Sequence, residues 1–382
     1  MSSPPLSGIR IVEFAGIGPG PFAGMMLADH GAEVIRIDRP ARGGGLTIDA
    51  QDSLLRSRKS IGLDLKNPAS IAAVRRIVKS ADAIIEGFRP GVMERLGLGP
   101  EVLLADNPRL VYGRMTGWGQ TGPMASEPGH DINYIAISGA LHALGRKDEK
   151  PTPPINLVGD FGGGGMFLAF GMLAALLHAR ATGEGQVVDA AMTDGSAVLM
   201  SMMWSFRAMG RWSDARGTNL LDTAAHFYDT YETKDGRFIS LGAIEPQFYA
   251  EFRKVMGLTD EKWAAQMDAR QWPALKDELT ARFREKTRDE WVTAFDGHEV
   301  CFAPVLGFDE AWDHPHNRAR GTFVEAGGVR QPAPAPRYSK SPTVAPVMAG
   351  ERQDAAILGE LGFDAAEIAA LITPEAASRT GT

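Results

Sequence analysis

Short β-branched runs alternate with helical patterns through the first half of the chain. We predict strands at residues 9–14, 32–37, 61–65, 83–85, 110–115 and 186–190. Helices are predicted at residues 22–31, 69–80, 160–181 and 194–209. Strands that alternate with helices are typical of a parallel, doubly wound sheet, so this half of the chain is assigned to the α/β class.

The pattern changes beyond residue 210. Residues 211–222 are polar and lack clean periodicity, which indicates a linker. Two alternating segments, 227–232 and 237–241, meet across Lys234-Asp235-Gly236 and predict a β-hairpin. Amphipathic helices are predicted after it, at residues 246–256, 272–286 and 289–295. This part of the chain is therefore predicted to be a second, smaller α+β domain.

These patterns divide the chain into four stretches. Residues 1–210 are the first part of a large domain, 211–225 a linker, 226–309 the small domain, and 310–382 a return linker with the C-terminal part of the large domain. The many prolines between residues 331 and 347 predict an extended chain that crosses back toward the large domain.

Charge and cysteine content narrow the classes of ligand. The 382 residues carry a formal net charge of -7, so we expect no general attraction to nucleic acid or to an acidic membrane, and an anionic ligand needs a local basic pocket. The single cysteine, Cys301, excludes an intramolecular disulfide and argues against a cysteine-based metal site. It lies in an apolar run, which predicts a small core residue.

Targeting signals are not recognisable in the sequence. The amino terminus does not read as a secretory signal, and the apolar segments 166–177 and 195–206 are shorter than the roughly 20 residues of a membrane span. We expect a cytoplasmic protein without membrane contact.

The first strand, glycine turn and helix resemble the start of a dinucleotide-binding fold. Gly16, Gly18 and Gly20 follow the strand, but Pro21 stands where a third glycine would let helix and strand pack, so an NAD site is disfavoured. The glycines can serve a tight turn only. They can also serve another ADP-like group, and CoA carries one.

Basic residues near predicted strand ends support an anionic ligand. The candidates are Arg36, Arg39, Arg42, Arg56, Arg58, Lys59, Arg89 and Arg95. Arg39 ends one predicted strand and Arg89 follows another, which places both at the carboxyl edge where open α/β sheets bind ligands.

His130 is the first candidate for acid/base chemistry. It stands in a polar turn that opens an apolar helix, and histidine is the usual general base near neutral pH. The alternative is a helix-capping turn in which Asp131 caps the helix and His130 only forms a hydrogen bond.

Asp160 is the second candidate, at the start of the predicted long helix. It can be a plain N-cap. However, Gly162 to Gly165 follow it, and four glycines weaken a helix but let a ligand lie against its first turn. Free N–H groups there are predicted to hold a developing enolate oxygen.

Two further segments contain acidic residues or histidines that are candidates for a functional role. Glu245 begins a predicted helix and gains a role only if it reaches His130, which sequence spacing does not decide. Asp313, His314 and His316 lie in a proline-broken turn with no further ligand nearby, so no metal site is predicted there.

Several separated motifs together resemble the α-methylacyl-CoA racemases, a family of the type III CoA-transferase superfamily. The similarity runs from about Leu6 to about Pro336. The motifs are GIGPGPFAGMMLADHGAEVIRIDRP, RMTGWGQTGP, GHDINY, NLVGDFGGG and GAIEPQFY, in this order.

The resemblance implies an interlocked homodimer, with each active site between the large domain of one subunit and the small domain of its partner. It implies His130 and Asp160 as the catalytic pair and Glu245 of the partner chain as the support of the histidine. The implied contacts of the CoA thioester are Arg39, Leu63, Asp64, Leu65, Lys66, Arg89, Arg95, Gly129, Asp131, Ile132, Asn133, Tyr134 and Asn156. No metal or separate cofactor is implied, since CoA is part of the substrate.

Inversion at the carbon beside a thioester requires two acid/base groups, because the enolate is planar and its two faces must be served separately. We expect His130 to deprotonate the S-epimer and protonated Asp160 to reprotonate it, with the roles reversed in the other direction. One segment departs from the family: Thr223-Ala224-Ala225-His226 stands where the racemases have Gly-Gly-Ala-Pro, and His226 has no evident role.

Two alternatives remain open. In a CoA-transferase, Asp160 would attack the thioester as a nucleophile and carry an acyl anhydride; His130 speaks for the racemase, because a transferase needs no base on the opposite face. The second alternative is a non-catalytic acyl-CoA-binding protein whose active-site pocket has lost its catalytic residues. The joint presence of His130, Asp160 and Glu245 argues against it.

Overall fold

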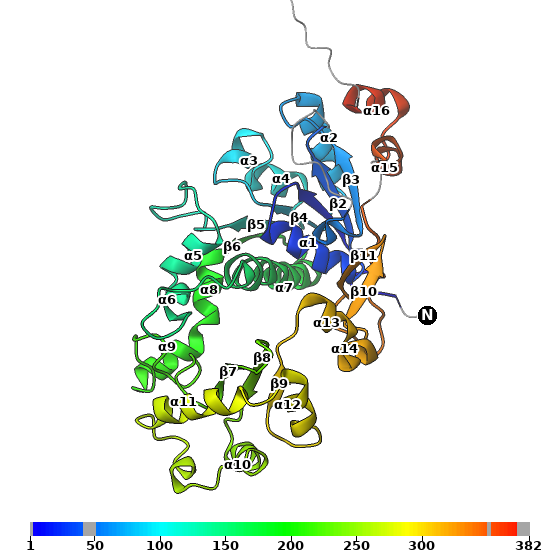
Figure 1. Ribbon diagram of the computed structural model, residues 1–382. Coiled ribbons are helices and arrows are strands. Elements are labelled where there is room, and N and C mark those ends of the chain that lie inside the picture. The colour runs from blue at the N-terminus through cyan, green and yellow to red at the C-terminus, as the bar shows by residue number, and fades with distance from the viewer. Residues whose placement is uncertain (1–2, 41–50, 350–352, 373–382) are drawn as a thin grey trace, which may run out of the picture. The chain divides into compact units, whose positions relative to one another are not determined.

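The computed structural model describes residues 3–40, 51–349 and 353–372, and its chain divides into two compact units (Figure 1). Unit 1 comprises residues 1–138, 155–199 and 321–382, and unit 2 comprises residues 139–154 and 200–320. This division differs from the predicted boundaries in two places. Residues 139–154 and 200–225 group with the small unit, and the chain re-enters unit 1 at residue 321 rather than 310.

Unit 1 is built on a six-stranded parallel sheet with the order β3-β2-β1-β4-β5-β6. The strands are β1 (Arg10–Phe14), β2 (Glu33–Asp38), β3 (Arg58–Gly62), β4 (Ala83–Glu86), β5 (Val111–Thr116) and β6 (Gln186–Ala191). The chain builds outward from β1 first on one side and then, from β4, on the other. The carboxyl ends of β1 and β4 therefore form the switch point at which such sheets bind ligands.

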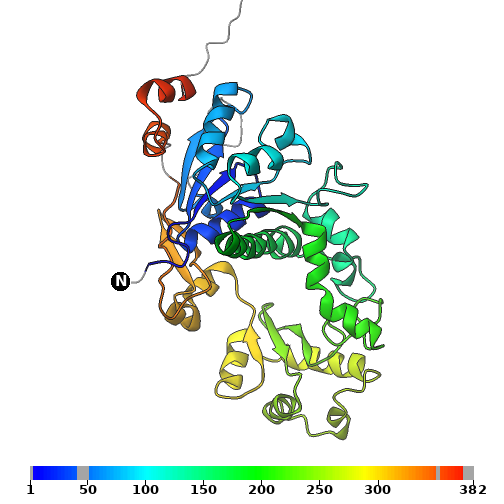
Figure 2. The ribbon, with the colours of Figure 1, turned by 180° about the vertical axis from the view of Figure 1, so that it is seen from behind.

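Helices cover both faces of this sheet, because successive strand residues point to opposite sides. On one face α1 (Pro19–Asp29) and α7 (Met166–Thr182) pack on Ile11 and Ile85. On the other face Val12 and Ile84 pack in a second core. The helices of that side are α2 (Pro68–Val78), α3 (Val92–Arg95), α4 (Pro100–Asp106), α15 (Asp354–Glu360) and α16 (Ala365–Ile372). Figures 1 and 2 show α15 and α16, in red, beside α2 and β3 at one end of the sheet.

The predicted long helix at 160–181 has a different form. It begins as a π-helix, η2 (Leu157–Gly165), which continues directly into α7. The joined segment Leu157–Thr182 has 26 residues and is long and apolar enough to cross a membrane, so the apolar segment predicted at 166–177 belongs to a longer one. A core helix of a soluble protein meets the same criterion, and 44% of the most apolar window is buried.

The predicted helix at 194–209 is likewise divided. It forms α8 (Met192–Leu199) in unit 1 and α9 (Ser201–Ala208) in unit 2. Also in unit 1 are α5 (Asp131–Ile137) and a hairpin that the sequence did not predict, β10 (Phe323–Ala326) with β11 (Val329–Pro332).

Unit 2 contains the predicted hairpin, β7 (Tyr228–Glu232) with β8 (Phe238–Gly242), extended by a short third strand, β9 (Phe302–Pro304). Its helices are α6 (Ala140–Ala143), α9, α10 (Pro246–Val255), α11 (Trp272–Phe283), α12 (Arg288–Phe295), α13 (Phe308–Asp313) and α14 (Pro315–Arg320). A core rich in aromatic residues, including Phe227, Trp263 and Phe283, packs α10, α11 and α12 against the strands β7 and β8. The expectation for Cys301 is wrong: this residue is exposed, with a positive φ of 54°, and it precedes β9 rather than lying within a core strand.

Candidate active site

His130 lies at the amino end of α5, as its N-cap residue, and is exposed. Its backbone N–H donates to Oδ1 of Asn133 at 3.0 Å, so Asn133 fixes the entry of the chain into the helix. Tyr134 holds the same turn, since its hydroxyl donates to the carbonyl of Gly129 and its ring packs edge-on against Trp118 with centroids 4.7 Å apart. The imidazole of His130 is therefore presented to solvent from a rigid turn.

Asp160 lies in η2 rather than at the cap of an α-helix. Its backbone N–H donates to Oδ1 of Asp131 at 2.7 Å, and the N–H of Phe161 donates to the carbonyl of Asn156. The prediction that free N–H groups at this point hold an enolate oxygen is therefore wrong for these two residues, because protein oxygens already accept from them. The carboxylate of Asp160 accepts from Nδ2 of Asn156 at 3.2 Å.

The turn after β1 closes on Asp160. A methyl group at Gly18 would lie 3.0 Å from Oδ2 of Asp160, and Gly18 has a φ of 69°. The predicted glycine turn thus lets the chain approach the carboxylate closely. Since this turn follows β1, Asp160 lies at the switch point of the sheet.

The surroundings of Asp160 shift the pKa of its carboxyl group. Its removal from water raises its pKa above the ordinary value, the hydrogen bond from Asn156 opposes this, the charge of Asp131 raises the pKa further, and His130 lowers it. His130 and Asp160 therefore lie close enough for their charges to interact. This places an exposed imidazole and a half-buried carboxyl group of raised pKa in one neighbourhood.

The glycines after Asp160 serve packing rather than a ligand. A methyl group at Gly163 would lie 2.6 Å from the backbone nitrogen of Ser196 in α8, and one at Gly165 would lie 2.7 Å from the ring of Phe22 in α1. The space predicted for a bulky ligand at these positions is thus filled by two helices.

Three of the predicted anion-binding arginines are structural. Arg36 and Arg58 both pair with the buried Glu13, and Arg56 pairs with Asp29. All three arginine side chains are buried. Their charges are neutralised inside the unit, so these residues are not available to an anionic ligand. Lys59 pairs with Glu33 and Glu360.

Arg42 lies outside the described residues, and the other basic candidates lie at the carboxyl edge of the sheet. Arg39 follows β2, Arg89 follows β4, and Arg95 ends α3; all three are exposed. The charge of Arg89 acts on the hydroxyl of Tyr134, which places Arg89 near the His130 turn. The edge can therefore present positive charge to an anionic ligand.

The other predicted CoA contacts divide by exposure. Leu63 is wholly buried in the core, so its side chain is not available to a ligand; in the loop that continues after it, Asp64 and Leu65 are half-buried and Lys66 is exposed. In the GHDINY stretch Ile132 is exposed, whereas Asp131 is buried against η2.

Glu245 belongs to unit 2, where it is the exposed N-cap of α10. The chain before it is anchored because Nε2 of Gln266 donates to the carbonyls of Ala243 and Ile244, at 3.0 and 2.8 Å. Its predicted contact with His130 of a partner chain stays a prediction.

His226 is the polar residue without a sequence-based explanation. It is fully buried in unit 2, its Nε2 lies 2.7 Å from the hydroxyl of Tyr249, and rings of Phe227, Tyr249 and Trp263 surround it. The aromatic residues spaced along this segment were the available signal for its burial. It is a core histidine of the small unit.

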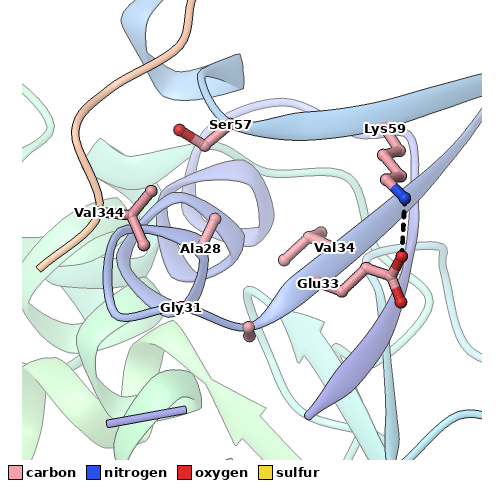
Figure 3. A pocket seen from close by; sticks show the side chains of 8 residues that line it. Ala28, Gly31, Glu33, Val34, Ser57, Lys59 and Val344 are labelled. Carbon is pink, nitrogen blue, oxygen red and sulfur yellow. Dashed lines mark hydrogen bonds and ion pairs between the residues drawn. The ribbon is translucent and has the colours of Figure 1, made fainter. Parts of the chain in front are cut away.

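A shallow pocket of unit 1 lies away from Asp160. It is lined by residues that include Ala28, Gly31, Glu33, Ser57 and Lys59, and an ion pair joins Lys59 to Glu33 across its wall (Figure 3). These residues lie at the amino ends of β2 and β3, opposite the edge that carries the acid/base candidates. Among the described residues no group of three or more His, Cys, Asp or Glu side chains gathers in a way that could hold a metal ion.

The six-stranded parallel sheet of unit 1 agrees with comparisons to known proteins. The sequence pattern of CoA-transferase family III matches residues 6–350, and the chain belongs to this family. Within it, the chain is 46% identical to the α-methylacyl-CoA racemase of Mus musculus over 368 residues and 45% identical to that of Homo sapiens over 369 residues, in each case covering 95% of both chains. A solved CAIB/BAIF family protein from Brucella suis superimposes with a TM-score of 0.82 at 26% identity, covering 94% of this chain and all of that one.

Proposed function

We propose that the chain is an α-methylacyl-CoA racemase, an isomerase that interconverts the (R)- and (S)-epimers of 2-methylacyl-CoA thioesters. The observation that carries this proposal is the pair formed by exposed His130 and half-buried Asp160, whose charges interact and whose carboxyl pKa is raised. The names of the two mammalian relatives support the same reaction.

The two residues divide the work of proton transfer. Neutral His130 takes the α-proton from the S-epimer, the electron pair of the C–H bond moves into the thioester as an enolate, and protonated Asp160 delivers its proton to the opposite face. In the reverse direction Asp160 is the base and protonated His130 the acid. Burial of Asp160 favours this cycle, because it keeps the protonated carboxyl accessible at a higher pH than an exposed aspartate would.

The carboxyl edge of unit 1 is the proposed CoA site. Arg39, Arg89, Arg95 and Lys66 are exposed there and carry the positive charge that the phosphates of CoA require. The backbone at Leu63 and the turn from Gly129 to Tyr134 are expected to line the same site.

We expect the active protein to be a homodimer in which Glu245 of the partner supports His130. An apolar stripe on α7 favours association: Met166, Phe170, Leu173 and Leu177 follow helical spacing, and Phe170 and Leu177 are 73% and 71% exposed. A cytoplasmic location, the lack of a separate cofactor, and the absence of nucleic-acid and membrane partners remain expectations.

A single experiment separates this proposal from its rivals. A pure 2-methylacyl-CoA epimer is incubated with the protein in deuterated water without an acceptor acid. A racemase incorporates deuterium at the α-carbon and loses optical purity, whereas a CoA-transferase with Asp160 as nucleophile requires a free carboxylate. Binding of acyl-CoA with no exchange under any condition would leave the non-catalytic alternative.

A further inference from the structure

Asp131 joins the segments that carry the two acid/base candidates. It directly follows His130 at the start of α5, and its Oδ1 accepts the backbone N–H of Asp160 in η2 at 2.7 Å. The side chain is 8% exposed. One buried carboxylate therefore sets the spacing between the turn of His130 and the backbone of Asp160.

The backbone of η2 packs closely against the side chain of Asp131. A methyl group at Gly159 would lie 2.3 Å from Oδ1 of Asp131, so η2 passes the carboxylate only because residue 159 is glycine. Oδ2 of Asp131 is buried and has no hydrogen-bond partner among the residues that the structure describes. A buried charge that is only half satisfied costs stability, which calls for a functional reason.

The second consequence of this position is electrostatic. The groups of α5 and its cap that act on Asp160 are His130 and Asp131, while Asn156 of its own segment donates to it. Tyr134 of α5 is itself acted on by the charge of Asp160. The α1 side contributes uncharged Gly18, and Asp194 at the start of α8 is exposed. Asp131 is the one negative group among those that shift the carboxyl pKa of Asp160, and it raises that pKa.

We propose that Asp131 is a positioning residue whose carboxylate anchors the backbone of Asp160 beside His130 and whose charge acts on the carboxyl group of Asp160. This inference rests on the proposed racemase function for its catalytic meaning, but the coupling between the two carboxyl groups exists without it. The side chain of Asp131 is thus assigned to Asp160, and the predicted contact of this residue with the CoA thioester stays a prediction.

Direct titration tests the coupling independently of catalysis. The ¹³Cγ signal of Asp160, assigned by its loss in Asp160→Asn, is followed with pH in the full-length protein and in Asp131→Asn, which keeps an oxygen to accept the N–H but removes the charge. The midpoint of Asp160 should fall, because the negative charge that opposes its ionisation is removed. Glu101→Gln removes an exposed carboxylate from α4 of the same unit and should leave the midpoint unchanged. Asp131→Ser provides the same comparison should Asp131→Asn not fold.

Kinetics then test the catalytic meaning. In Asp131→Asn the acidic limb of the kcat/KM profile should move to lower pH equally for both epimers, with KM for the thioester little changed. Asp131→Ala, which loses the anchor as well, should lower kcat by a further factor of about ten. An unchanged Asp160 midpoint in Asp131→Asn would overturn the inference. If the wild-type protein inverts no substrate while the Asp160 midpoint still shifts in Asp131→Asn, the proposed function is refuted and the coupling between the two carboxyl groups stands.

Discussion

At the residue scale, the two acid/base groups owe their difference to their surroundings. His130 stands exposed at a helix cap, and Asp160 is partly removed from water and faces another carboxylate. The sequence predicted both residues from their local motifs. It did not predict the role of Asp131, because the contact spans 29 positions and depends on how η2 passes over α5.

The close approach of Gly18 to Asp160 predicts the outcome of one substitution. Gly18→Ala should lower kcat about ten-fold, because the added methyl group would lie 3.0 Å from Oδ2 and displace the carboxylate. Gly97→Ala is the matched control, since Gly97 has a similar φ of 71° and nothing within 4 Å of the new methyl group. Steady-state kinetics on both variants checks this, and equal losses of activity would attribute the effect to backbone strain alone.

Asn156 predicts a pH effect of the opposite sign to that of Asp131. Its hydrogen bond stabilises the charged form of Asp160, so Asn156→Ala should raise the pKa of Asp160 further. The reaction needs one proton shared by the pair and stops when both members are protonated. The acidic limb of kcat/KM should therefore move to higher pH. A limb that moves to lower pH in this variant would contradict the described contact.

At the element scale, the alternation of strands and helices was predictable, while the helix interruptions were not. The sheet strands and the hairpin of unit 2 appear within a few residues of their predicted positions. The π-helix η2 was missed because its form results from packing: Gly163 and Gly195 meet so closely that a methyl group on Gly195 would lie 1.8 Å from the carbonyl of Gly163. Local sequence patterns do not predict a contact between glycines so far apart in the chain.

His226 makes the core of unit 2 sensitive to acid. Burial lowers its pKa from 6.5 to about 4, so the unfolded chain binds the proton more tightly than the folded one. Its contribution to stability is present above pH 6.5 and is lost as pH falls toward 4, by up to about 3 kcal/mol. The opening equilibria of peptides from α10 and β7, obtained from hydrogen–deuterium exchange corrected for the intrinsic exchange rate at each pH, should become more favourable as pH falls across this range.

The His226→Gln variant supplies the control for this prediction. Glutamine can still accept from the hydroxyl of Tyr249, but it does not titrate. Its corrected opening equilibria in α10 and β7 should depend less on pH between 6.5 and 4 than those of the wild type. The same pH dependence in both proteins would assign the acid sensitivity to other groups.

At the scale of the whole molecule, the sequence predicted two domains, and their boundaries were inferred from local changes in the pattern of hydrophobic and polar residues. Residues 139–154 precede the predicted linker by more than fifty positions, yet they group with unit 2, where Arg146 pairs with Asp229 at 3.0 Å. Such pairings join segments far apart in sequence, and periodicity carries no information about them.

Association through α7 predicts a change in oligomeric state. The double variant Phe170→Glu/Leu177→Glu places two charges in the apolar stripe and should dissociate the proposed homodimer, because a buried unpaired charge is costly. Val292→Glu makes the same change at a single exposed position of α12 and should not. Light scattering after size exclusion measures both. A wild-type monomer, or a double variant of unchanged mass, would contradict the role of the stripe.

The central claim, that His130 and Asp160 serve opposite faces of one carbon, is tested most directly by solvent deuterium exchange in the two single variants with each pure epimer. Asp160→Asn should exchange the α-hydrogen of the S-epimer without inverting it, since His130 remains. His130→Ala should do the same for the R-epimer through Asp160, and each variant should invert at least about 100-fold more slowly than the wild type. If either variant inverted substrate at the wild-type rate, or if one substitution abolished exchange of both epimers while the other had no effect, the two-base account would be wrong.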